Sequence, residues 1–225
     1  NTSDFKKRKG ELRMNRKLQW TPALRRRVAM CIIGNIILGL GVALTKLTAF
    51  GNDPFNGMCM AVSARIGIPY AVYTPIFNLA LFGLELLFGR KYIHIGTFVN
   101  WFLLCYAVSF FLWIGELFGV TVLSGMALRL AVLVVGLIVI SFGLALYQRA
   151  DLGVAPYDAI PLMVCDRWPR VPFFWARIAL DGLSTVVVWL AGGIVGIGTL
   201  LTALALGPVV DFFMRRLDKR LGVAP

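Results

Sequence analysis

The sequence has few of the residues that soluble enzymes use for chemistry. It contains one histidine (His94) and four cysteines, with no CxxC spacing, and only 15% of its 225 residues are charged, against about a quarter in soluble domains. A single histidine argues against a His/Cys zinc site and against histidine-based nucleophilic catalysis. Apolar residues make up 59% of the chain, which predicts an integral membrane protein.

Positive charge is plentiful but is concentrated at the two ends. Ten of the 23 Lys and Arg residues fall within the first 27 positions, four more lie at positions 215–220, and nine lie between Val28 and Met214. The net charge of +12 is compatible with nucleic-acid binding, but the basic residues flank apolar runs and form no stripe with interleaved aromatics. We predict no nucleic-acid partner, a basic arm over 1–27 and a basic tail over 215–225. Residues 1–13 precede Met14 and are expected to be a cloning remnant or a solvated arm.

Six apolar runs are long enough to cross a bilayer, which takes about 20 residues. They are Val28–Phe50, Tyr70–Gly89, Ile93–Glu116, Met126–Gln148, Pro172–Gly193 and Val195–Met214. Two shorter runs, Pro54–Ile66 and Pro156–Cys165, cover about half the hydrocarbon at about 1.5 Å per residue. Each begins with a proline, which favours the first turn of a helix. We predict an all-α membrane protein with six transmembrane helices and two half-helices that enter the membrane and return.

The distribution of Lys and Arg among the loops predicts the direction of insertion. With six crossings and a cytoplasmic N-terminus, both basic ends and the pair Arg90 and Lys91 face the cytoplasm, and the outside receives only Lys46, Arg65 and Arg129. Eight full crossings would place Arg90 and Lys91 outside. We therefore expect both termini to be cytoplasmic.

The sequence repeats itself at an offset of 102 residues. Gly41-Val-Ala-Leu44 aligns with Gly143-Leu-Ala-Leu146, and Gly51-Asn-Asp-Pro-Phe-Asn56 aligns with Gly153-Val-Ala-Pro-Tyr-Asp158. Because each unit has an odd number of crossings, the second is inserted upside down. Inverted-topology repeats with broken helices recur in transporters. We predict repeat 1 over 28–116, a linker over 117–125 and repeat 2 over 126–214. The alternative is a duplication that only built a stable bundle.

These motifs resemble those of the YczE/YitT-type bacterial membrane proteins over about residues 28–214. Ala150-Asp-Leu-Gly-Val-Ala-Pro-Tyr-Asp158 is similar to the family's A-x-L-G-x-x-P-W-D, and Gly207-Pro-Val-Val-Asp211 is similar to its later motif. The first half departs from the pattern, because Asn56 replaces the Asp and Ser109 stands at the repeat position of Asp211. The resemblance implies an inner-membrane protein. Some members are associated with production or export of peptide metabolites, which implies an accessory role as an alternative.

Polar side chains stand at the start of both predicted half-helices. Asp53 is placed to cap the first, with Asn56 in its first turn, and Asp158 lies in the first turn of the second. Self-capping is the plain interpretation, and the alternative is that both starts form a substrate-binding site at mid-membrane. A helix N-terminus carries about half a positive charge. Ionised Asp53 and Asp158 would therefore make the site acidic and favour a cation, a proton or a polar neutral solute.

Polar residues inside the predicted spans are functional hypotheses because they are costly in hydrocarbon. Arg177 and Asp181 lie four residues apart on one helix face and are either a structural ion pair or a gating and coupling pair. Asn78, which matches Asp181 when the repeat is allowed one residue of slack, is assigned to the substrate site. Glu85 shares the face of Asn78 and is expected to snorkel towards the basic residues that follow. Asp211 either pairs with a basic residue one turn later or joins the gating group.

We predict a membrane transporter for a small solute or ion, and a secondary one, because no P-loop or other nucleotide motif is present. The expected partners are the lipid bilayer and a small polar solute or cation, a proton included, and a homo-oligomer is left open. No cofactor, metal or catalysis is expected, since the spans contain no nucleophile–base pair. The alternatives are a non-transporting accessory or scaffold protein for a biosynthetic or export assembly, and a passive channel.

Overall fold

The computed structural model describes residues 22–221, except for the side chains at positions 23, 173, 174, 218, 220 and 221. This part of the chain folds into α-helices with one 3-10 turn and no strand. The elements are α2 (Pro22–Leu47), α3 (Pro54–Ile66), α4 (Tyr70–Phe88), η1 (Arg90–Tyr92), α5 (Ile95–Leu117), α6 (Met126–Arg149), α7 (Pro156–Arg167), α8 (Phe173–Leu190) and α9 (Ile197–Leu221). Most of the predicted basic arm, residues 1–21, lies outside the described residues.

The helices lie close to the positions predicted from hydropathy. The short helix α3 coincides with the run that begins at Pro54, and α7 begins at Pro156 as expected and ends at Arg167. The largest differences are at charged ends, because α2 already begins at Pro22 and α9 continues to Leu221. Lys and Arg are good helix formers, so these helices continue beyond their apolar runs.

Five of the described helices are long and apolar enough to cross a membrane, namely α2, α4, α5, α6 and α9. The counterpart of the sixth predicted span is α8, whose 18 residues include Arg177 and Asp181, and it is not one of the five. Large apolar side chains such as Leu87, Leu204 and Phe110 lie exposed on these helices. An apolar outer surface of this kind is suited to lipid. The sixth crossing stays a prediction.

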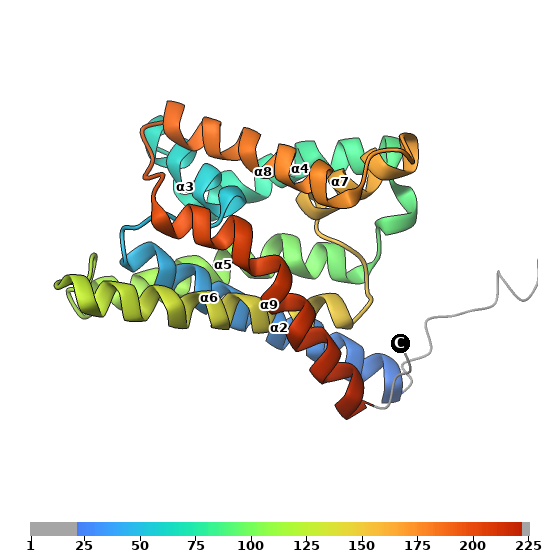
Figure 1. Ribbon diagram of the computed structural model, residues 1–225, viewed down its shortest axis with the longest axis horizontal. Coiled ribbons are helices and arrows are strands. Elements are labelled where there is room, and N and C mark those ends of the chain that lie inside the picture. The colour runs from blue at the N-terminus through green and yellow to red at the C-terminus, as the bar shows by residue number, and fades with distance from the viewer. Residues whose placement is uncertain (1–21, 222–225) are drawn as a thin grey trace, which may run out of the picture.

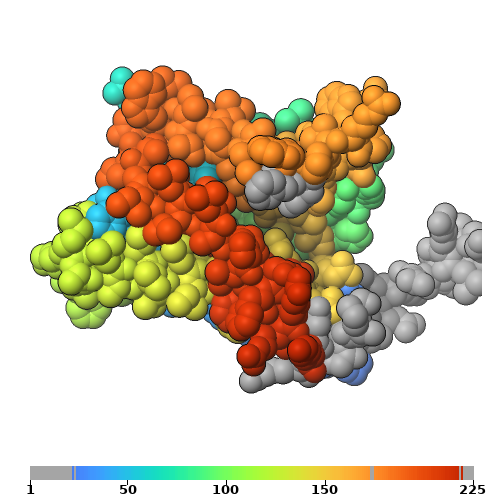
Figure 2. All heavy atoms as spheres, viewed as in Figure 1, coloured from blue at the N-terminus to red at the C-terminus, as the bar shows by residue number. Residues whose placement is uncertain are grey.

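The helices are arranged in two groups (Figure 1). One group contains α2, α5 and α6, and the other contains α3, α4, α7 and α8. Within the second group α3 packs against α8, and α4 packs against α7. Helix α9 crosses from the second group to the first, and the space-filling view shows it lying across α6 (Figure 2). The polar residues of the predicted site lie where the two groups face each other.

Glycines bring the backbones of α2 and α6 into contact. A Cβ added to Gly143 would lie 2.5 Å from the Leu38 nitrogen and 2.8 Å from the Gly34 oxygen, and one added to Gly41 would lie 2.7 Å from the Ile140 nitrogen. A later position in α2 thus meets an earlier position in α6, so the two helices are antiparallel. Small residues permit this close approach between membrane helices. Helix α2 also packs against α5, and a buried apolar cluster that includes Leu38 and Ile140 fills the space around this crossing.

One backbone hydrogen bond, from the first turn of a helix to a loop, occurs twice at the offset of the sequence repeat. Gly96 N–H donates to the Leu152 oxygen at 2.6 Å, and Gly198 N–H donates to the Phe50 oxygen at 2.9 Å. Residues 96 and 198 differ by 102, as do 50 and 152. The second hydrogen bond is therefore the first with the two halves of the chain exchanged.

Candidate functional site

A cavity of about 580 Å³ lies between the starts of α3 and α7 and the helices α8 and α9. Every residue that the sequence patterns single out for binding, gating or coupling lines it: Asp53, Asn56, Asn78, Asp158, Arg177, Asp181 and Asp211. Apolar residues, among them Leu104 and Ile140, make up much of the remaining wall. A cavity of this size with a few converging polar groups has the character of a small-molecule site.

Asp53 caps helix α3 and also holds the side chain of Asn56. The Asn56 backbone N–H donates to Asp53 Oδ1 at 3.1 Å, and Asn56 Nδ2 donates to both Asp53 oxygens at 3.1 Å. Tyr70, the first residue of α4, donates its hydroxyl to Asn56 Oδ1 at 2.5 Å. In the described part of the chain no Lys or Arg pairs with Asp53. Its carboxylate is thus hydrogen-bonded but not neutralised by a cation.

Helix α7 receives its cap from a different helix. Ala155, the N-cap residue, has no side-chain cap of its own, and its N–H donates at 2.6 Å to the hydroxyl of Tyr147 on α6. Tyr147 is buried. The self-capping role considered for Asp158 is therefore taken by Tyr147, and Asp158 bonds elsewhere.

Replacing Tyr147 with phenylalanine is expected to lower the free energy of unfolding by about 1–3 kcal/mol, because the buried N–H of Ala155 loses its acceptor. Thermal unfolding in detergent measures the effect. Tyr106→Phe is the matched control, since Tyr106 is 57% exposed on α5 and the change there should leave Tm unchanged. Equal Tm values for the two variants would contradict this role of the hydroxyl.

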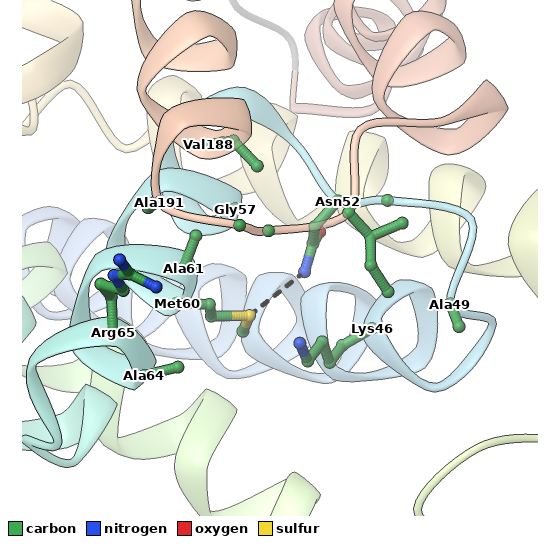
Figure 3. Close-up of a pocket in the computed structure, with 14 residues that line it drawn as sticks. Lys46, Ala49, Asn52, Gly57, Met60, Ala61, Ala64, Arg65, Val188 and Ala191 are labelled. Carbon is green, nitrogen blue, oxygen red and sulfur yellow. Dashed lines mark hydrogen bonds between the residues drawn. The ribbon is translucent and has the colours of Figure 1, made fainter.

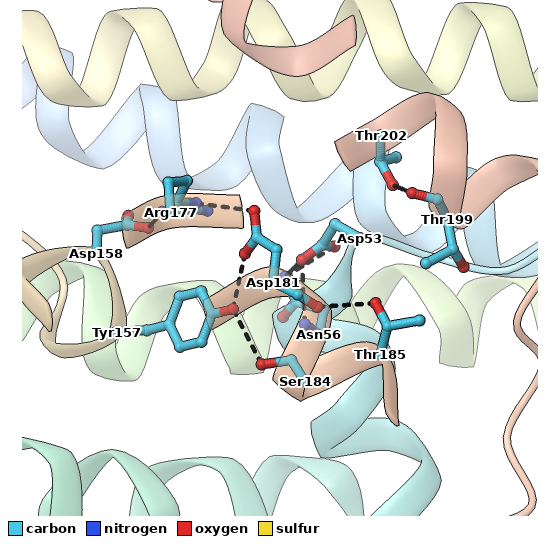
Figure 4. Close-up of polar contacts among 10 residues, drawn as sticks. All are labelled: Asp53, Asn56, Tyr157, Asp158, Arg177, Asp181, Ser184, Thr185, Thr199 and Thr202. Carbon is cyan, nitrogen blue, oxygen red and sulfur yellow. Dashed lines mark hydrogen bonds and ion pairs between the residues drawn. The ribbon is translucent and has the colours of Figure 1, made fainter. Parts of the chain in front are cut away.

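Arg177, which lines the cavity, bridges two carboxylates (Figure 4). Its Nη1 lies 2.5 Å from Asp158 Oδ1 and its Nε lies 3.0 Å from Asp181 Oδ2. The other oxygen of Asp181 accepts from the Tyr157 hydroxyl at 2.8 Å, and that hydroxyl lies 3.0 Å from Ser184 Oγ. The expected pairing of Arg177 with Asp181 is present, and Asp158 extends it to a second helix.

The starts of α3 and α7 lie next to each other. The ring centroids of Phe55 and Tyr157, each one residue after the proline that begins its helix, are 4.5 Å apart. Figure 4 shows Asp53 on one side of Asp181 and Asp158 on the other. Two segments that are 102 residues apart in sequence thus contribute to one polar wall.

Carboxylates outnumber cations on the cavity wall. Among the described lining residues Arg177 is the one cation, whereas Asp53, Asp158 and Asp181 are three acids. Asp211 is a fourth acid, but its side chain is 58% exposed. Its carboxylate lies 2.8 Å from Arg215, so Asp211 forms the ion pair with a basic residue one turn later that its spacing allowed. With these groups ionised, the cavity is negative and favours a cation or a polar neutral solute over an anion.

Sequence patterns did not identify three further polar groups of this site: Tyr70, Tyr157 and Ser184. Ser184 could have been found, because positions 177, 181 and 184 follow the helical spacing of one face. Tyr157 is the repeat partner of Phe55, and because phenylalanine is apolar the comparison of the two repeats did not indicate a polar role for this position. Tyr70 contacts Asn56 on another helix, and the sequence pattern around either residue does not predict this contact.

The end of α7 is tied to η1 by a surface ion pair. Lys91 Nζ lies 2.6 Å from Asp166 Oδ2, and the Tyr92 hydroxyl donates to the same oxygen at 2.8 Å. The Lys91 ammonium, and after it the Tyr92 hydroxyl, hold the pKa of Asp166 below its ordinary value. The pair is solvent-exposed and so contributes little to stability. Asp166 is therefore a suitable control for changes at Asp158 on the same helix.

A second cavity, of about 410 Å³, lies beside the ends of α2 and α3 (Figure 3). Its charged lining residues, Lys46 and Arg65, each lie in the last turn of a helix, where a cation is stabilised by the helix dipole. Asn52 Nδ2 donates to the Val42 oxygen at 3.2 Å. These residues thus have structural explanations. Across the side chains that the structure describes, no cluster of three or more His, Cys, Asp or Glu could hold a metal ion.

Comparison with known proteins relates the chain to bacterial membrane proteins. A profile described as "Family of unknown function (DUF6198)" matches residues 25–215. The chain is 28% identical over 182 residues to the "Uncharacterized membrane protein YczE" of Bacillus subtilis (strain 168), covering 80% of this chain and 81% of YczE. The expected resemblance to YczE-type proteins is thereby confirmed, and the chain is a multi-pass membrane protein.

Two further relatives have similar length. The "Uncharacterized protein YyaS" of Bacillus subtilis (strain 168) is 26% identical over 182 residues, covering 81% of this chain and 89% of YyaS. An "Uncharacterized protein" of Haemophilus influenzae (strain ATCC 51907 / DSM 11121 / KW20 / Rd) is 27% identical over 204 residues, covering 87% of this chain and 86% of the relative. No solved structure matches the chain.

Proposed function

Since this chain belongs to the DUF6198 family of unknown function, we propose a function from its own cavity: secondary transport of a small polar solute or cation across the bacterial inner membrane. The observation that carries the proposal is the polar wall built by Asp53, Asp158, Arg177 and Asp181 inside a bundle of apolar helices. Charged groups are costly at membrane depth and generally mark solute or ion pathways.

An inverted-topology repeat with two half-helices is part of this proposal. The hydrogen bonds of Gly96 with Leu152 and of Gly198 with Phe50 support it, because exchanging the two halves converts one contact into the other. The antiparallel crossing of α2 and α6, which are repeat partners, also supports it, since a two-fold axis in the membrane plane relates antiparallel helices. In transporters built this way the solute site lies where broken helices meet near the midplane.

The surplus of carboxylates supports the solute class. Asp158 and Asp181 share the single guanidinium of Arg177, and among the described residues only Asn56 donates hydrogen bonds to the Asp53 carboxylate. A cationic group that entered the cavity would find an acidic acceptor, whereas an anion would be repelled. We further propose that both termini face the cytoplasm and that the driving force is an ion gradient, with no catalytic step.

Replacing Asp158 with asparagine is expected to lower solute flux at least about tenfold. A hydrogen bond to a charged group contributes about 1.5–3 kcal/mol, and about 1.4 kcal/mol corresponds to a factor of ten. Arg177 keeps Asp181 as its partner, so the variant should remain folded. The measurement is uptake of sodium, potassium, choline, ethanolamine, glycine and lysine into proteoliposomes that contain the full chain.

Asp166→Asn serves as the control, because it removes a carboxylate from the same helix outside the cavity. It should leave the flux at the parental level. Parental flux in Asp158→Asn for every transported solute would contradict the proposal, and so would the absence of flux through the parent protein. Flux that rises without saturating would identify a passive channel instead of a carrier.

A further inference from the structure

Glu85 is an acidic residue enclosed within a membrane helix. It lies in α4, one turn before the end of that helix, and none of its surface is exposed. Neither carboxyl oxygen has a hydrogen-bond partner in the part of the chain that the structure describes. The expectation that Glu85 snorkels towards the following basic residues is therefore wrong. Arg90 donates to the Leu86 oxygen, and Lys91 pairs with Asp166.

The helices packed against α4 offer no counterion to Glu85. The phenol of Tyr147 on α6 lies close enough to Glu85 for an electrostatic interaction, and the main neighbours of α4 are α3, α5, α7 and η1. Their titratable or charged groups are Cys59 and Arg65 on α3; His94, Cys105, Tyr106 and Glu116 on or next to α5; Asp158, Tyr157, Cys165, Asp166 and Arg167 on α7; and Arg90, Lys91 and Tyr92 of η1. Within the described residues, none of these groups forms a hydrogen bond or an ion pair with the Glu85 carboxyl.

A carboxyl group in this environment holds its proton. The effective cost of placing an unpaired ion in a protein interior is several kcal/mol, even after relaxation, and a buried acid without a counterion neutralises itself instead. The neutral acid costs less because it has no net charge to desolvate. The enclosed state of Glu85 in this conformation is therefore the protonated one.

The position of Glu85 connects it to the cavity. Asn78 lines the cavity, and Glu85 follows it by seven residues, which places both on one face of α4. At this end α4 packs against α7, where a Cβ on Gly89 would lie 2.6 Å from the Met163 sulfur. Helix α7 also supplies Asp158 to the cavity. A shift of α7 against α4 would thus alter the cavity and the enclosure of Glu85 together.

We propose that Glu85 is a proton-binding site that couples proton movement to transport. This inference rests on the proposed transport function. The carboxylate accepts a proton from water when α4 and α7 are apart, is enclosed as the neutral acid in the conformation described here, and returns the proton to water when the helices separate towards the other side. A charged Glu85 opposes closure, so the enclosed state forms only with the proton bound.

The test of protonation needs no solute. Infrared spectra of the reconstituted full chain at neutral pH should contain the C=O stretching band of a protonated carboxylic acid, and Glu85→Gln should lose the Glu85 part of it. Glu116→Gln, at an exposed glutamate of α5, is the matched control and should retain that band. Because a protonated acid and an amide have nearly the same shape and charge, Glu85→Gln should also keep Tm within about 2–4 °C, the shift that about 1 kcal/mol produces.

A spectrum in which parent and Glu85→Gln do not differ would overturn the proposal, as would a Glu85→Gln variant that fails to fold. Coupling is tested with each solute that the parent protein transports. Glu85→Gln should remove the dependence of uptake on an imposed pH gradient and preserve solute exchange at equal pH. Retained dependence on the gradient would overturn the coupling role. The failure of all transport, with the infrared difference present, would instead reject the proposed function.

Discussion

Replacing Arg177 with glutamine is expected to lower the free energy of unfolding by about 3 kcal/mol, the lower end of the range for a broken buried ion pair. The guanidinium neutralises Asp158 and Asp181 at the same time, at 2.5 and 3.0 Å. The exposed fraction of the side chain is 31% for Arg177, 19% for Asp158 and 12% for Asp181. Without the cation, two carboxylates face each other across the cavity wall. Thermal unfolding in detergent and in titrated SDS measures the loss.

Two further variants identify the cause of this loss. Arg65→Gln removes an exposed cation from the last turn of α3 and should cost less than about 1 kcal/mol, the size of a helix-dipole contribution. Adding Asp158→Asn and Asp181→Asn to Arg177→Gln should recover most of the stability, because no unpaired charge remains. If the triple variant is as unstable as Arg177→Gln alone, the loss comes from packing around the guanidinium and the electrostatic explanation is wrong.

Replacing Gly143 with alanine is expected to destabilise the protein by about 3 kcal/mol, the upper end of the range for overpacked cores. The added methyl group would lie 2.5 Å from the Leu38 nitrogen and 2.8 Å from the Gly34 oxygen. Both are backbone atoms of α2, so no side chain can rotate away and the helices must move apart. The same unfolding measurements apply, together with the yield of folded monodisperse protein.

Gly207→Ala is the matched control within α9, because a Cβ there meets nothing within 4 Å. It should leave stability unchanged or raise it by about 0.5–1 kcal/mol through the better helix propensity of alanine. Equal stability of Gly143→Ala and Gly207→Ala would contradict the backbone-to-backbone packing of α2 and α6.

Hydropathy and proline placement predicted most of the helical architecture. The start of α3 at Pro54 and of α7 at Pro156 follows from local chemistry, because proline suits the first turn of a helix. The polar residues Asp53, Asp158 and Asp181 were identifiable as candidates because an apolar segment makes each of them conspicuous. Their gathering around one cavity is a property of the fold, since α3 is distant in sequence from α7 and α8.

Contacts between helices could not be predicted from local patterns. The sequence indicated that Arg177 could reach Asp181 one turn away, but not that it also binds Asp158, 19 residues distant. It offered two roles for the start of α7 and did not identify the hydroxyl of Tyr147 as its cap. In each case the partner depends on the rotation of one helix against another, which hydrophobic periodicity leaves free.

The sequence by itself determined that the chain is a helical membrane protein, where most of its helices begin, and which polar residues require an explanation. These properties depend on the transfer of individual segments from water to lipid, which is additive along the chain. The tertiary structure alone decided that Arg177 joins two carboxylates and that Glu85 is enclosed without a partner. A side chain's solvation and its counterions depend on which helix faces meet, and that is set by packing of the whole bundle.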